Sequence, residues 1–314
     1  MMKLSAFQHN FSVKAVCRVT GIDPETAVLR TTELVRKSLL QADPENGRFE
    51  MHPLLRQYTE KHLSASGYKD EVLDAHKHHY LNLARENEHG LIGEKMLACR
   101  KNMDAEFGNI RKAWQRAVDQ KDLSALLGAA KGVYVYFDMH TRYHESRALF
   151  QPAKALVMEM ARTEPCPDMA LILLCRLDMT AKERLTARQS SELKEMAGRC
   201  LRLAVKGKNR SGRAFSLLLM GAVAQKEKAW DKAIRLFGLS LKADPGIEQA
   251  FWVTVRMGLC RQAQGRMDKA MEYFRQGHKA GSDAGDEIKK AWTLPMISSL
   301  RPTRILFIDL TPST

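Results

Sequence analysis

Apolar residues recur at helical spacing along most of this chain, and two short apolar runs interrupt that pattern near its beginning. Ser12 precedes a helical pattern that stops at Gly21. Asp23-Pro24-Glu25 then opens a second helix, because a capping aspartate, a proline and an acidic residue are favoured in that order at a helix start. The pattern therefore predicts two helices before residue 40.

A β-hairpin and a third helix follow. Leu39-Leu40-Gln41-Ala42 and Arg48-Phe49-Glu50-Met51 flank a turn that contains Asn46-Gly47, a strong hairpin signal because both turn residues tolerate positive φ. Pro53 suits the first turn of a helix, where its missing N–H would have no intrahelical partner. Helix, helix, hairpin and helix is the order of a winged-helix domain.

Residues 1–65 are therefore predicted to form a truncated winged-helix domain. Only Leu4-Ser5-Ala6-Phe7 remains for the helix that normally comes first. Without that helix we expect part of the domain's apolar face to lack cover, at Val13, Val16, Val28 and Val35.

The distal half of the chain contains a repeat. Gly221, Ala233 and Phe237 recur as Gly258, Ala270 and Phe274, at an offset of 37 positions that is close to the tetratricopeptide period of about 34. Gly265 marks the turn of the second repeat, and Lys228 takes its place in the first. We expect both repeat glycines where two helices approach closely, with the alanines facing them. Leu127 to Lys154 and, less regularly, Met169 to Val205 suggest further pairs.

This pattern predicts a mainly all-α fold with one small β-hairpin. The expected order is a partial winged helix, a helical connector at 66–122, an α-solenoid of tetratricopeptide-like hairpins at 123–293 and a non-repeat tail at 294–314.

Two motifs in this order resemble a known family. Met51-His52-Pro53 resembles the strand–helix junction of the winged-helix subdomain in NB-ARC and STAND signalling ATPases, whose motif reads Met-His-Asp. Glu106-Phe107-Gly108-Asn109-Ile110-Arg111-Lys112-Ala113 resembles a helix that joins winged helix to repeats in bacterial STAND ATPases of the predicted-ATPase and LuxR-regulator kind. The resemblance implies that His52 occupies the position that senses the nucleotide phosphate, with proline replacing the aspartate.

Composition and charge narrow the partners. The 314 residues carry a net charge of +14, which suits nucleic acid or an acidic partner without specifying either. The sequence has no apolar run of membrane-spanning length and no secretory signal at its start, so we expect a cytoplasmic protein with no membrane partner. Its six scattered cysteines are typical of reduced thiols.

No motif for catalysis is present. The chain lacks a GxxxxGK[ST] phosphate loop, and Gly128-Ala129-Ala130-Lys131-Gly132 has neither the spacing nor a preceding strand. His76, His78 and His79 do not form a ligand set, since the second of them points away from the other two on a helix. We therefore expect no enzymatic activity, no cofactor and no metal.

Three functions remain open. The resemblance implies a regulatory and scaffolding arm of a STAND-type ATPase, which binds a protein or small-molecule inducer through its repeat groove and works with a nucleotide-binding domain or a signalling partner. The alternative is a standalone DNA-binding transcriptional regulator whose winged helix contacts DNA through Arg30, Arg36, Lys37 and Arg48. A truncated gene product without independent activity is the third.

Overall fold

The computed structural model describes residues 1–91, 95–160, 187–283, 285 and 287–299. The predicted tail beyond residue 299 and the first part of the Met169–Val205 pair lie outside the described residues. The chain divides into two compact units, Met1–Leu219 and Met220–Thr314, and each is described by itself.

The first unit begins with the elements expected of a winged helix. A 3₁₀ helix (η1) leads into helices α1 and α2, a two-stranded antiparallel hairpin and helix α3; the bounds are η1 Met2–Ala6, α1 Val13–Thr20, α2 Pro24–Arg36, β1 Gln41–Asp43, β2 Arg48–Glu50 and α3 Pro53–Ala65. The caps form where the sequence places them: the Ala15 N–H donates to Ser12 Oγ over 3.2 Å, and the Thr26 N–H donates to Asp23 Oδ1 over 2.9 Å.

The segment between η1 and α1 completes this part of the core. The rings of Phe7 and Phe11 stack with centroids 4.3 Å apart, and both side chains are buried. Phe11 also pairs with Phe49 through two backbone hydrogen bonds of 2.8 and 2.9 Å, so it borders the hairpin. Of the valines expected to lack cover, Val16 is buried and Val28 is 48% exposed, while Val13 and Val35 are partly buried.

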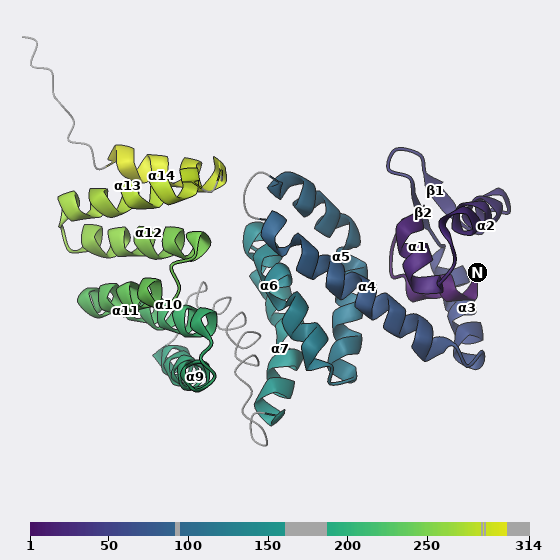
Figure 1. Cartoon of the computed structure of the whole chain (residues 1–314), viewed down its shortest axis with the longest axis horizontal. Coiled ribbons are helices and arrows are strands. Elements are labelled where there is room, and N and C mark those ends of the chain that lie inside the picture. Colours follow the sequence, from purple (N-terminus) through teal and green to yellow (C-terminus); the bar gives the residue numbers. More distant parts are fainter. Residues whose placement is uncertain (92–94, 161–186, 284, 286, 300–314) are drawn as a thin grey trace, which may run out of the picture. The chain divides into compact units, whose positions relative to one another are not determined.

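Long helices follow in the described part of the first unit: α4 Lys69–Gly90, α5 Met96–Asp119, α6 Leu123–His140, α7 Tyr143–Met160, α9 Ala187–Lys206 and α10 Arg210–Lys226, the last of which continues into the second unit. Helices α4, α5 and α6 pack against one another (Figure 1). Trp114 of α5 is fully buried, stacks edge-on with Phe150 of α7 and donates its indole N–H to the carbonyl of Leu149 over 3.1 Å.

A glycine sets the approach of α4 to α6. A Cβ at Gly132 would overlap the carbonyl oxygen of Ala84 and lie 2.9 Å from its carbonyl carbon. By contrast, a Cβ at Gly128 would meet only the Arg85 side chain, at 3.6 Å. The Gly128–Gly132 stretch therefore serves helix packing, since its second glycine lets two backbones touch.

In the second unit, helices α11 Trp230–Ala243, α12 Ile247–Ala263, α13 Met267–Asp283 and α14 Glu287–Ser299 follow α10, and neighbours in sequence lie side by side (Figure 1). The turns after α10 and α12 use the same conformation, with φ of 61° at Lys228 and 75° at Gly265. Helix α14 runs through the predicted boundary between the repeats and the tail. The predicted fold class, mainly helical with one small hairpin and stacked helical pairs, is confirmed.

Within the described ranges, no helix combines the length and the apolar character needed to cross a membrane.

Candidate functional site

His52 lies at the corner between β2 and α3, where it caps the helix. Its Nδ1 atom accepts a hydrogen bond from the Leu54 N–H over 3.3 Å, and its side chain is exposed. One ring nitrogen is thus already hydrogen-bonded. It accepts from one of the amides in the first turn of α3 that have no partner within the helix.

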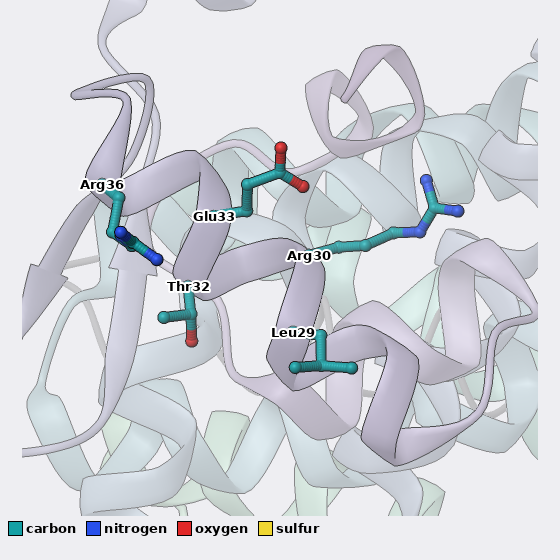
Figure 2. Close-up of a pocket in the computed structure, with 5 residues that line it drawn as sticks. All are labelled: Leu29, Arg30, Thr32, Glu33 and Arg36. Carbon is teal, nitrogen blue, oxygen red and sulfur yellow. The ribbon is translucent and has the colours of Figure 1, made fainter.

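The residues predicted to contact DNA divide between two environments. Arg30, Arg36 and Lys37 lie on or directly after α2 and are exposed. Lys37 pairs with Glu33 one turn earlier, at 2.5 Å. A shallow hollow on α2 is lined by Leu29, Arg30, Thr32, Glu33 and Arg36, and Figure 2 shows the Arg30 side chain extending away from the others. Leu29 is 72% exposed, so this face combines charge with apolar surface.

Arg48, by contrast, is held inside the protein. Its Nη2 atom lies 2.8 Å from Oε1 of Glu106, and their side chains are 12% and 4% exposed. The same guanidinium donates from Nε to Oδ1 of Asn10 over 3.1 Å and from Nη2 to the Asn10 carbonyl over 3.2 Å. This buried pair joins the turn end of the hairpin to α5, and it leaves little of the Arg48 guanidinium for a phosphate.

Asn109, one turn after Glu106, fastens the same junction. Its Oδ1 atom accepts from the Gln8 N–H over 2.7 Å, and its Nδ2 atom donates to the Asn10 carbonyl over 3.1 Å. It also donates to Glu106 Oε2 over 3.4 Å. Asn109 therefore satisfies backbone groups about a hundred positions away in sequence, with both ends of its amide. We call Asn10, Arg48, His76, Glu106 and Asn109 the junction cluster.

Other residues of the motif pack α5 against two parts of the protein, the segment before α1 and helix α6. A Cβ at Gly108 would lie 2.7 Å from Nε2 and 3.1 Å from Cγ of His9, so the ring of His9 lies directly against this glycine. Phe107 stacks on Tyr136 of α6 with centroids 4.6 Å apart and meets Phe137 edge-on. The motif on α5 thus contacts the segment before α1 with one set of residues and α6 with another.

His76 of α4 closes the cluster as a neutral imidazole. It is buried, its Nε2 lies 3.4 Å from Asn109 Oδ1, and its ring lies 4.6 Å from that of Tyr80. Burial, together with the positive charge of Lys112, lowers the pKa of His76 to about 3. Burial and the negative charge of Glu106 raise the pKa of Tyr80, so that hydroxyl also stays neutral.

We expect His76 to make stability fall in mild acid. The unfolded chain takes up a proton near pH 6.5 while the folded chain does not until about pH 3, so the free energy of unfolding decreases as pH falls between these values. The difference between wild type and His76→Gln should change by up to about 1.4 kcal/mol per pH unit below 6.5 and stay constant above it. Urea unfolding at several pH values measures this, and a pH-independent difference would contradict the assigned pKa.

Sequence reasoning identified the α5 motif by resemblance but did not identify its contacts. The junction cluster unites residues from the segment before α1, the hairpin, α4 and α5, and no local pattern relates them. One signal was present: Glu106 and Asn109 are polar residues at positions where a helical pattern places the core. Buried polar side chains need partners, so such positions indicate a hydrogen-bonded junction.

The repeat residues come together in two equivalent sets. The ring of Phe237 lies against Gly221, where a Cβ would be 2.5 Å from Cε1; the ring of Phe274 lies against Gly258 at the same distance. Ala233 and Ala270 are fully buried nearby on the same helices as the phenylalanines. The atoms nearest to each glycine belong to the phenylalanine and not to the alanine, because the ring fills the space that the missing side chain leaves.

Gly258→Ala should therefore destabilise the second unit by about 1–3 kcal/mol, since the added methyl group must displace a buried ring. Gly238→Ala is the matched control, because a Cβ there meets nothing within 4 Å and alanine favours the helix by about 1 kcal/mol. Thermal unfolding of both variants measures the difference. If both variants changed the stability equally, the Phe274 ring would be able to move aside without a loss of stability.

The described residues contain no group of three or more His, Cys, Asp or Glu arranged to hold a metal ion. Burial raises the pKa of Cys200 to about 12 and that of Cys260 to about 11, so both remain neutral thiols.

No protein-family model matches the sequence. No curated protein matches it either. Among solved structures, the chain is similar to a Signal Transduction ATPase with Numerous Domains (STAND) protein with a tetratricopeptide repeat sensor from Pyrococcus horikoshii, at 12% identity and a TM-score of 0.38. The match covers 95% of this chain and 52% of that one, so the chain spans about half the length of the structure that it matches.

Proposed function

We propose that this chain is the regulatory arm of a STAND-type signalling ATPase, which binds a protein or small-molecule inducer through its helical repeats and has no catalytic activity of its own. The observation that carries the proposal is the junction cluster. A domain that only links other parts needs no buried ion pair and no asparagine that bonds to backbone 101 positions away. Such a junction makes the winged-helix elements and α5 move together.

The geometry of α5 supports a relay. Phe107 packs on α6 while Glu106 holds Arg48 of the hairpin, and these two residues are adjacent in sequence. A displacement of α6 by a ligand would therefore be transmitted to the hairpin and to His52, which directly follows β2 and Met51. In the proposed ATPase, this is the corner that faces the nucleotide.

The alternative reading as a DNA-binding winged helix receives less support. Arg48 is engaged by Glu106 and Asn10, and Lys37 pairs with Glu33. Only Arg30 and Arg36 of the four predicted contacts are both exposed and outside those pairs. Two cations make a weak footprint, because each phosphate contact adds a modest increment of affinity.

The absence of a phosphate cradle from the sequence leads to one prediction. Purified chain should show no ATP turnover, and calorimetry should detect no saturable ATP or ADP binding at micromolar concentration, since backbone amides of a phosphate loop are needed to hold the nucleotide. Tight nucleotide binding by this chain alone would contradict the proposed division of labour.

The relay itself can be tested with the phosphate-loop ATPase domain that the proposal requires, whether it is encoded in the same reading frame or in a neighbouring one. We expect the wild-type chain to bind that domain and change its ATP turnover. Phe107→Leu should keep the binding and weaken the change in turnover, because it loosens the contact with α6 and leaves the residues of the junction cluster unchanged. Glu159→Gln, at an exposed surface pair with Lys121, should behave as wild type. A defined duplex held about a thousandfold more tightly than random DNA would favour the transcription-factor alternative.

A further inference from the structure

The turn between α9 and α10 lies within a run of positively charged residues. From Met196 to Lys226 the sequence contains seven lysine or arginine residues and no aspartate or glutamate. Six of the seven fall between Arg199 and Arg213. This stretch belongs to neither the winged-helix elements nor the junction cluster.

Exposed cations lie on the end of α9, on the turn and on the start of α10. Arg199, Arg202 and Lys206 follow one another at spacings of three and four, so they share the exposed face of α9. Lys208 lies in the turn with φ of 54°, and Arg213 lies in the first turn of α10; both are exposed. We call these five residues the basic turn.

The turn is held in place by its own backbone. The Asn209 N–H donates to the Ala204 carbonyl over 2.8 Å, and Asn209 Oδ1 accepts from the Gly212 N–H over 2.7 Å. The end of α9 and the start of α10 are thereby fixed next to each other (Figure 1). The exposed cations on both sides therefore lie close to one turn of the chain.

Helix stability does not explain the basic turn. A lysine in the last turn of α9 complements the helix dipole, which accounts for Lys206. Arg213, at the start of α10, opposes the dipole, and that first turn contains no acidic residue. Among described residues, none of the five side chains forms an ion pair with an acidic side chain; Glu192 and Glu195, further toward the start of α9, mark the edge of the surface.

The surface suits a polyanion better than a folded protein. Val205, at 54%, is its one exposed large apolar residue among those described. Protein interfaces need buried apolar or aromatic anchors at their centre. A phosphodiester backbone needs only cations, because binding releases condensed counterions. We propose that the basic turn binds the phosphate backbone of duplex nucleic acid without reading its sequence.

The test compares two surfaces of equal charge. Arg202→Gln/Lys206→Gln/Arg213→Gln removes three cations from the basic turn, and Arg30→Gln/Arg36→Gln/Lys37→Gln removes three from α2 and its end. Binding of a fluorescent random duplex is followed by anisotropy over a series of salt concentrations. The basic-turn variant should reduce the slope of log affinity against log salt by about two to three, at about 0.9 per phosphate contact. The α2 variant should keep the wild-type slope.

Other outcomes overturn the proposal. Equal losses in both variants would mean diffuse attraction by net charge, and a loss confined to the α2 variant would move the contact to the winged-helix elements. Absence of wild-type binding at about 50 mM salt would exclude a phosphate-binding surface of this size. Displacement of the duplex by polyglutamate at equal charge concentration would identify an acidic polypeptide as the partner. Lys206→Gln alone, with an expected slope change of about 0.9, serves if the triple variant does not fold.

Discussion

Gly132→Ala should unfold the first unit at a much lower urea concentration than wild type. The added methyl group would overlap the carbonyl oxygen of Ala84, and a backbone carbonyl cannot rotate out of the way as a side chain can. Helices α4 and α6 must then separate along their contact, which places the expected loss at or above the upper end of the usual overpacking range, about 3 kcal/mol. Circular dichroism during urea unfolding measures this.

Gly128→Ala, one turn earlier on the same helix, is the control. Its Cβ would make ordinary contact with the Arg85 side chain, and alanine favours a helix over glycine by about 1 kcal/mol. We expect Gly128→Ala to be neutral or stabilising. If the two variants unfolded together, the close approach of α4 and α6 would not exist in solution.

Glu106→Gln should destabilise the first unit by about 3–5 kcal/mol, because it leaves the buried guanidinium of Arg48 without its negative partner. The glutamine keeps the size of the side chain, so the loss would report charge and not packing. Urea unfolding at neutral pH provides the measurement. Glu159→Gln, whose partner Lys121 is 62% exposed, should change stability by no more than about 1 kcal/mol.

A double variant separates the net contribution of the Arg48–Glu106 pair to stability from the free energy lost when only one partner is removed. Arg48→Met/Glu106→Leu removes both charges and replaces them with apolar groups, which often recovers most of the loss from a buried pair. We expect this variant to be clearly more stable than Glu106→Gln. If it were equally unstable, the hydrogen bonds from Arg48 to Asn10 would be the main contribution.

Local signals made much of the fold predictable. Ser12 and Asp23 cap the helices that the sequence assigns to them, and Gly47 adopts the positive φ, 64°, that a turn at this point requires. The repeat offset likewise places Lys228 and Gly265 in equivalent turns. Each of these features depends on residues close together in sequence, where capping and turn preferences act directly.

Long-range features were not predictable in the same way. The sequence predicts Arg48 as a DNA contact in the hairpin, but the fold places Glu106 of α5 against its guanidinium. Gly132 lies in a stretch whose spacing excludes a phosphate loop, and its contact with Ala84 depends on how two helices cross. The contact between the Phe237 ring and Gly221 depends on the direction of the phenylalanine side chain, which the repeat spacing alone does not determine.

The hydrogen bond between the Gln8 N–H and Asn109 has a consequence for the order of folding. This bond closes a loop that runs from Gln8 to Asn109, and the chain loses conformational entropy before the contacts across that loop can form. The helical pairs around Gly221 and Gly258, by contrast, form from segments that are neighbours in the chain. During synthesis, residues 1–65 leave the ribosome before α5 exists, so Arg48 and the amides near Asn10 remain hydrated until then. We therefore expect residues 1–65 to reach their native packing only after α5, which ends at Asp119, has left the ribosome, and arrest of translation before that point to leave them susceptible to proteolysis.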